Sequence, residues 1–168
     1  AARIPFEVIP LDVEESYPDS LSPQDIPEYL AQKKAAAAMP FAKGGIVLAA
    51  DSLVLKDNKV YGKPADRDEA ITMIGELAGE VHQVITGVCL VNTRRQRCFS
   101  CTSHVHLDQM TDEEIAYYVD QFEPYDKAGA YAIQEWIGHC KIRKIEGSYN
   151  NIMGLPTHMV YEALRTFR

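Results

Sequence analysis

The sequence contains few cysteines and no long apolar run. Its four cysteines, among 168 residues, do not have the spacings of a secreted disulfide framework. No apolar stretch approaches the roughly 20 residues that cross a membrane. The first residues do not show the basic segment and following apolar run that are typical of a signal peptide. We therefore expect a cytoplasmic protein without a membrane partner.

Common catalytic and phosphate-binding motifs are also missing. Neither Gly-x-x-x-x-Gly-Lys-Ser/Thr nor Gly-x-Gly-x-x-Gly occurs, and no nucleophile elbow supports a Ser/His/Asp mechanism. The net charge is -7, and the one basic cluster, Arg94, Arg95 and Arg97, falls in an expected hairpin tip. These features argue against a nucleic-acid partner. An acidic protein that binds an anion must use local lysines, backbone amides or a metal ion.

The residues that are present predict one domain that mixes hairpins and helices. The hydrophobic fraction of 46% and the charged fraction of 24% are ordinary for a globular protein. Patterning and capping signals predict strands over 6–11, 45–55, 81–91, 97–107 and 141–145, and helices over 22–38, 66–77, 111–122 and 156–167. The expected fold class is α/β with mixed α+β character.

The run from Asp126 to Gln134 is the most informative segment. It combines a charged pair, a glycine flanked by alanines, an aromatic residue and a terminal amide. The small residues around Gly129 allow close approach of the backbone to another group. Lys127 can meet an anion, and Gln134 can read a hydrogen-bonding edge. The run predicts a pocket for an anionic, hydrogen-bonding ligand.

Asp51 is the first candidate for chemistry, because it interrupts the apolar run 46–54. A carboxylate in such a run is costly unless it is paired, metal-bound or at an edge that reaches water. The functional interpretation is a general base or a metal ligand. Glu14 and Glu15 would be ordinary solvated acids by themselves, but with Asp51 they could hold a divalent cation through hard oxygen ligands.

Two lysines are candidates for phosphate contacts. Lys63 lies between Gly62 and Pro64, which constrain the backbone as a positioned contact would require, although a plain turn explains the pattern equally well. Lys34, near the end of its expected helix, could reach the same anion. Compensation of the helix dipole is its more common explanation.

The cysteines and histidines at 98–106 do not support a zinc site. Cys98 and Cys101 are followed by His104 and His106. Strand alternation places Cys101 on the opposite face from Cys98 and both histidines. We therefore disfavour zinc and expect the remaining histidines to be structural.

Taken in order, several segments resemble the Maf family of nucleoside triphosphate pyrophosphatases, over nearly the whole chain. The matching segments are 12–16, 30–31 with 34–35, 50–52, 62–64, 126–134, 147–151 and 154–156. The resemblance implies an elongated mixed sheet with flanking helices and two lobes around a cleft, similar to the inosine triphosphate pyrophosphatases.

The resemblance also implies an activity and a set of site residues. The implied reaction converts a nucleoside triphosphate substrate to a monophosphate and pyrophosphate. Asp51 falls on the family's proton acceptor, and Glu15 and Asp51 would hold Mg²⁺ or Mn²⁺. Lys34, Lys63 and Gln134 fall on positions that contact phosphate or base. A homodimer is the family-like expectation.

Ser52 and Gln134 indicate the subfamily. Members that resemble dTTP/UTP pyrophosphatases carry Thr after the catalytic Asp and Gln in the later run, and Ser52 keeps the hydroxyl. A Gln amide suits the edge of uracil or thymine. Lys127 either orders its loop through Asp126 or faces phosphate, and both interpretations stay open.

Two rival functions accompany this expectation. One is hydrolysis of 7-methyl-GTP, and the other is nucleotide binding without turnover, by a regulator linked to septum formation. The family also begins with a strand and a Ser-x-Ser-Pro-Arg-Arg loop that binds phosphate. Nothing in residues 1–5 matches that loop, so the 1–168 domain is expected to lack it.

Overall fold

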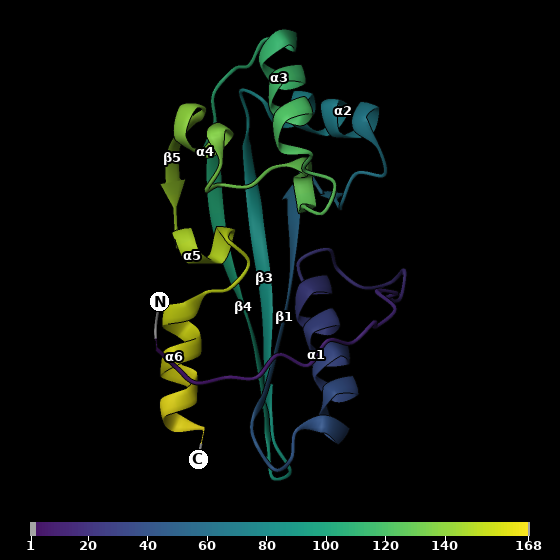
Figure 1. Cartoon of the computed structure of the whole chain (residues 1–168), viewed down its shortest axis with the longest axis vertical. Helices are drawn as coiled ribbons and strands as arrows, with labels where there is room; N and C mark the ends of the chain where they lie inside the picture. Colours follow the sequence, from purple (N-terminus) through teal and green to yellow (C-terminus); the bar gives the residue numbers. More distant parts are fainter. Residues whose placement is uncertain (1–2, 168) are drawn as a thin grey trace.

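An elongated five-stranded sheet organises the molecule. The computed structural model describes residues 3–167, in which the strand order is β2-β1-β3-β4-β5 and all neighbouring strands pair antiparallel (Figure 1). The strands are β1 (Val47–Lys56), β2 (Lys59–Tyr61), β3 (Val81–Val91), β4 (Gln96–Leu107) and β5 (Ile142–Glu146). Because β2 and β5 are short, it is the long strands β1, β3 and β4 that run through both ends of the molecule.

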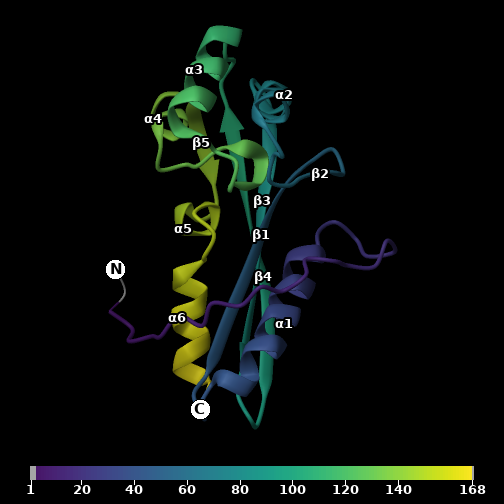
Figure 2. The same cartoon turned by 45° about the vertical axis from the view of Figure 1, so that its right-hand side comes forward.

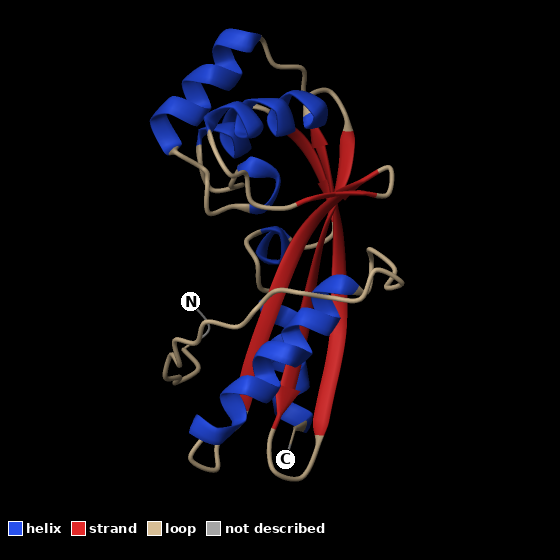
Figure 3. Ribbon diagram, turned by 90° about the vertical axis from the view of Figure 1, so that its right-hand side faces the viewer, coloured by secondary structure: helices blue, strands red, loops and turns tan. Residues whose placement is uncertain are grey.

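Helices cover the sheet differently at its two ends. At one end α1 and α6 lie on opposite faces of the long strands, and at the other end α2 and α3 pack together (Figures 1 and 2). Figure 3 shows a long helix lying along the strands at the lower end and several helices gathered at the upper end. The helices are α1 (Ile26–Ala38), η1 (Met39–Phe41), α2 (Arg67–Leu77), α3 (Asp112–Phe122), η2 (Ala128–Ala130), α4 (Trp136–Cys140), α5 (Tyr149–Ile152) and α6 (Thr157–Thr166). The predicted α/β class is confirmed.

Capping side chains begin the helices where the sequence predicted. The Asp66 side chain accepts a hydrogen bond from the Glu69 amide at the start of α2. Thr111 and Glu114 form a complete capping box at the start of α3. These side chains satisfy amides that have no partner within the helix. Local chemistry therefore sets both helix starts.

The core has separate clusters at the two ends. The largest joins α2 and α3 to the sheet and includes Ile74, Tyr118 and Val105, all fully buried. A smaller cluster packs Leu30 of α1 against Ile85 of β3. Each amphipathic helix thus buries its apolar stripe on the sheet or on another helix.

Gly87 allows α1 to lie unusually close to the sheet. A Cβ at this position would come within 2.2 Å of the backbone of Pro27 and Glu28. Gly87 is the direct partner of Asp51 in the antiparallel β1–β3 register. The close packing therefore brings α1, which carries Lys34, over the strand that carries Asp51.

The expected strand over Phe6–Leu11 is wrong. The segment is extended but pairs with no strand among residues 3–167, and Phe6 and Val8 are 83% and 75% exposed. An apolar, β-branched composition favours a strand only where a neighbouring strand supplies backbone partners and a packing surface. The sequence pattern reported the preference of the segment, but not the presence of a partner.

The cysteines also lie differently from the zinc pattern that was considered. Cys89 and Cys98 stand opposite each other in the β3–β4 register and form a disulfide. Within residues 3–167, no group of three or more His, Cys, Asp or Glu side chains is placed to hold a metal ion. In the same residues, no helix is both long enough and apolar enough to span a bilayer.

Candidate active site

One cavity of about 520 Å³ is lined by residues of β1, of α1 and the loop before it, and of the segments after β2 and around η2. This volume suits a small-molecule ligand. Seven of the residues predicted from the sequence line it, namely Glu15, Lys34, Asp51, Ser52, Lys63, Lys127 and Gln134, whereas the candidate Glu14 does not. The fold thus gathers residues from five separate segments around one space. Their individual roles stay predictions.

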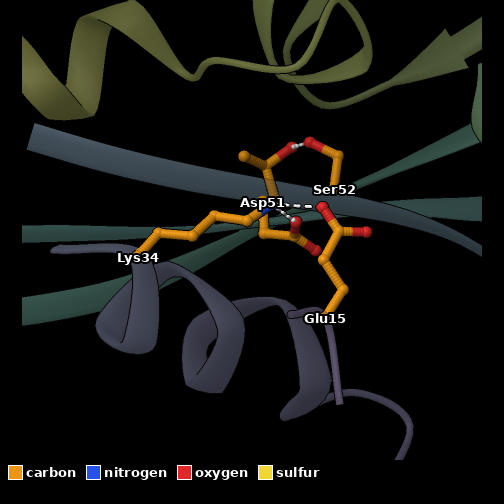
Figure 4. A network of polar contacts seen from close by, with 5 residues as sticks. Glu15, Lys34, Asp51 and Ser52 are labelled. Carbon is orange, nitrogen blue, oxygen red and sulfur yellow. Dashed lines mark hydrogen bonds and ion pairs between the residues drawn. The ribbon is translucent and has the colours of Figure 1, made fainter. Parts of the chain in front are cut away.

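Lys34 joins the two predicted acidic residues. Its Nζ lies 2.7 Å from Glu15 Oε1 and 2.5 Å from Asp51 Oδ1 (Figure 4). The lysine comes from α1, the aspartate from β1, and the glutamate from the loop that precedes α1. The Asp51 side chain is 12% exposed, whereas that of Glu15 is 47% exposed. Asp51 is therefore the least exposed member of a charged triad.

Burial and charge act against each other in this triad. Burial raises the pKa of the Asp51 carboxyl above its usual value, although the hydrogen bond from Lys34 opposes this. Burial alone would lower the pKa of Lys34, but its hydrogen bonds to Asp51 and Glu15 outweigh burial and raise it. The hydrogen bond with Lys34 lowers the pKa of Glu15. The hydrogen bonds with Lys34 therefore favour the charged forms of all three groups, whereas burial opposes the ionised form of Asp51.

The triad is compatible with a divalent cation. Glu15 and Asp51 offer carboxylate oxygens, which are the hard ligands that Mg²⁺ and Mn²⁺ prefer. Both carboxylates already converge on one cationic group, the Lys34 ammonium. A cation held by two carboxylates also takes ligands from water or a bound phosphate. The donor set therefore fits a metal that is shared with an anionic ligand.

Lys63 extends the positive charge along the cavity. It follows β2 in the segment Gly62–Pro64 and lines the same space as Lys34. Within residues 3–167, Lys63 takes part in no ion pair. Its charge nevertheless acts on Glu15 and Asp51 and favours their ionised forms. An unpaired lysine beside such a cavity is well placed to meet an anion.

The run 126–134 forms another wall of the cavity, and Gly129 explains its close approach to β1. Gly129 has φ of 71°, and its amide donates to the Gly62 carbonyl at 3.0 Å. A Cβ here would lie 2.9 Å from Val54 Cγ2. Only glycine fits both the left-handed backbone and the contact with β1. The structure thus accounts for the small residues that drew attention to this run.

Lys127 is engaged with its own loop. Its Nζ lies 2.9 Å from Asp126 Oδ1 and 3.9 Å from Glu135 Oε1. Glu135 also accepts a hydrogen bond from the Tyr118 hydroxyl, which in turn accepts one from the Ala132 amide at 3.0 Å. These contacts tie the wall to α3 and favour a loop-ordering role for Lys127.

A neutral hydrogen-bond network lies on the other face of β1. Ser52 Oγ is 2.7 Å from Thr86 Oγ1, and Thr86 Oγ1 is 3.1 Å from the Asn151 carbonyl oxygen. Figure 4 shows Ser52 directed away from the Lys34 triad. Thr86 and Asn151 are fully buried. Neither was singled out from the sequence as a site residue, because a Thr in a strand and an Asn after a Gly-Ser turn carry no signal of their own.

A buried histidine supports the same cavity wall. His82 Nε2 pairs with the Tyr131 hydroxyl at 2.7 Å, and Tyr131 lines the cavity. Burial lowers the pKa of His82 to about 4. His82 is therefore neutral at physiological pH, in agreement with the structural role expected for it.

Comparisons with known proteins identify the family of the chain. The family described as "Maf-like protein" matches residues 1–167. A protein of Porphyromonas gingivalis named dTTP/UTP pyrophosphatase is 46% identical over 161 residues, which cover 93% of this chain and 80% of the relative. A Bacteroides thetaiotaomicron protein of the same name is 47% identical over 155 residues, which cover 92% of this chain and 80% of the relative.

A third relative gives the most extensive overlap of these three. The Parabacteroides distasonis protein, also named dTTP/UTP pyrophosphatase, is 46% identical over 166 residues, which cover 98% of this chain and 86% of the relative. The family match spans the elements that carry every wall of the cavity. The chain belongs to the Maf family.

Proposed function

We propose that this protein is a nucleoside triphosphate pyrophosphatase that hydrolyses dTTP and UTP to the monophosphate and pyrophosphate. The observation that carries the proposal is the charged Asp51–Lys34–Glu15 triad, which shares one cavity with Lys63 and Gln134. The names of relatives at 46–47% identity support the same substrate class.

Asp51 is the proposed general base. It takes a proton from the water that attacks the α-phosphorus, while the bond to the bridging oxygen of the β-phosphate breaks and pyrophosphate leaves. Burial raises the pKa of Asp51, which makes the carboxylate a better proton acceptor than an exposed aspartate. General bases typically contribute about 10²- to 10⁴-fold to a rate.

Lys34, Lys63 and Glu15 are proposed to offset the negative charge of the triphosphate, the lysines directly and Glu15 by holding a metal ion. Lys34 and Lys63 neutralise the phosphate oxygens and the departing pyrophosphate. Glu15 and Asp51 would hold Mg²⁺ or Mn²⁺, which polarises phosphate oxygens when it is bound. The present pairing of Lys34 with both acids keeps the triad assembled between turnovers.

The other side of the cavity is proposed to read the base. Gln134 carries an amide that both donates and accepts, and it lines the cavity with Ser52. Together the two side chains match the alternating carbonyl and N–H groups of uracil and thymine. Lys127 is proposed to order this wall through Asp126 and Glu135 rather than to contact phosphate.

A nucleotide panel tests the proposal. Pyrophosphate release from dTTP, UTP, CTP and 7-methyl-GTP is measured with added Mg²⁺ or Mn²⁺, and dTTP and UTP should give the highest kcat/KM. Preference for 7-methyl-GTP would contradict the assigned substrate. Nucleotide binding without pyrophosphate release would instead support a regulator.

A further inference from the structure

The hydroxyl of Ser52 belongs to a chain of hydrogen bonds that ends on a main-chain carbonyl. The chain runs from Ser52 on β1 to Thr86 on β3 and then to the carbonyl of Asn151 on α5. Its inner members, Thr86 and Asn151, are completely shielded from solvent. The proton positions inside this chain are therefore decided by the protein and not by water.

The carbonyl at the end gives the chain its direction. A carbonyl oxygen can only accept, so the Thr86 hydroxyl donates to Asn151. The reverse orientation would leave two buried acceptor oxygens facing each other without a hydrogen between them. Because the single hydroxyl proton of Thr86 is used in the bond to Asn151, Ser52 must be the donor in its 2.7 Å hydrogen bond with Thr86. Ser52 then has only lone pairs to offer to the cavity.

The end of the chain is held in place. The Asn151 side-chain amide donates to the Val84 carbonyl at 3.0 Å and to Ser103 Oγ at 2.9 Å. The Asn151 carbonyl also accepts from the Gly154 amide at 2.9 Å. These bonds attach the segment that carries Met153 and Gly154, which line the cavity, to β3 and β4. The acceptor at the end of the chain is thus a rigid part of the fold.

We infer that Thr86 and Asn151 make Ser52 an obligate hydrogen-bond acceptor, and that this selects bases carrying an N–H at the N3 position. The inference rests on the proposed function and deepens it. Uracil and thymine present N3–H, whereas cytosine presents a bare N3 acceptor, which an acceptor-only Ser52 cannot bind. Thr86 is in this sense a positioning residue that acts through Ser52.

The test compares Thr86→Val, Thr86→Ser and Thr102→Val. Valine keeps the shape of Thr86 but removes the hydroxyl that takes the Ser52 proton, whereas serine keeps that hydroxyl. Thr102→Val is the matched control, because Thr102 is exposed on the adjacent β4. KM and kcat for UTP and CTP are measured for each variant, and Kd by calorimetry.

We expect Thr86→Val to lower the UTP-over-CTP preference in KM and Kd roughly tenfold, because one hydrogen bond is redirected, with little change in kcat. Thr86→Ser and Thr102→Val should keep the wild-type preference. An unchanged preference in a folded Thr86→Val, or equal losses for both nucleotides, would overturn the inference.

A measurement on the unmodified protein keeps the inference testable if Thr86→Val does not fold. N3-methyl-UTP lacks the N3 proton, and we expect its Kd to be at least tenfold higher than that of UTP. Equal affinities would overturn the inference. Failure of the proposed function is recognised separately, because it removes turnover of UTP and dTTP in the wild type, while the binding preference still decides the role of Ser52.

Discussion

The two sides of the cavity begin one residue apart and are built from opposite kinds of interaction. Asp51 and Ser52 are neighbours on β1, and strand alternation directs them to opposite faces. Asp51 enters a charged triad with the half-exposed Glu15 and with Lys34. Ser52 enters a neutral chain whose other members are buried. The strand β1 thus separates the charged triad from the neutral hydrogen-bond chain that is proposed to contact the base.

The difference shows what each side can contribute. Charged groups near solvent can exchange partners, so the triad can release Lys34 or the acids to an arriving phosphate. Buried neutral hydrogen bonds cannot be exchanged at low cost, since an unpaired buried group is penalised by ~1–3 kcal/mol. The charged side is therefore suited to chemistry, and the neutral side to fixed geometry.

The largest expected effect lies on the charged side. Asp51→Asn keeps the shape of the side chain but removes the base, so we expect kcat to fall about 10²- to 10⁴-fold. Asp57→Asn is the matched control, because Asp57 lies in the exposed turn after the same strand. Pyrophosphate release reports both. Full turnover by Asp51→Asn would contradict the role of Asp51 as general base, and with it the assignment of the chemical step to the charged side of the cavity.

The buried His82, which pairs with the cavity residue Tyr131, should give the protein a pH-dependent stability. Burial, with smaller effects of Lys56 and His106, lowers the pKa of His82 from 6.5 to about 4. Between these values the unfolded chain binds the proton and the folded protein does not, so stability rises with pH across this window. The contribution is complete above about pH 6.5 and lost as the pH falls toward 4, by roughly 3 kcal/mol.

Urea unfolding at a series of pH values measures this contribution. His82→Gln, which does not titrate, should flatten the dependence between pH 4 and 6.5. His139→Gln is the control, because His139 is exposed on α4. A variant at His82 that keeps the full wild-type slope would contradict the assignment of the slope to this residue.

Tyr118→Phe tests how α3 holds the cavity wall formed by residues 126–134 in place. The substitution removes the hydroxyl that joins Glu135 to the Ala132 amide, and we expect a loss of ~1–3 kcal/mol in unfolding free energy. The wall should also loosen, which raises KM several-fold and leaves kcat nearly unchanged. Tyr117→Phe, on the exposed side of α3, is the control. A fall in kcat alone would place Tyr118 with the chemical step.

The smallest effect separates two lysines of the same cavity. Lys63 has no ion-pair partner among residues 3–167, so Lys63→Met should raise KM for UTP roughly tenfold, as expected when a charged contact is lost. Lys127 pairs instead with the exposed Asp126, so Lys127→Met should raise KM less than Lys63→Met does and should change the free energy of unfolding by less than ~1 kcal/mol. Steady-state kinetics compare them. Equal increases in KM would show that Lys127 also contacts phosphate.

The sequence predicted most elements through local signals. The capping residues Asp66 and Thr111 begin helices as expected, because a cap depends only on residues within one turn. The apolar segment Phe6–Leu11 failed as a strand prediction, because a strand depends on a partner that lies elsewhere. Locality of the interaction decides which of these predictions succeeded.

By itself the sequence determined the residues that carry charge and conformational freedom. Asp51 was conspicuous because a carboxylate is costly in an apolar strand, and Gly129 because small residues permit close approach. The tertiary structure alone decided that Lys34 bridges Asp51 and Glu15, since Gly87 lets α1 pack directly on the sheet. It alone also placed Thr86 and Asn151 behind Ser52, because ordinary polar residues gain a role only when burial removes their water.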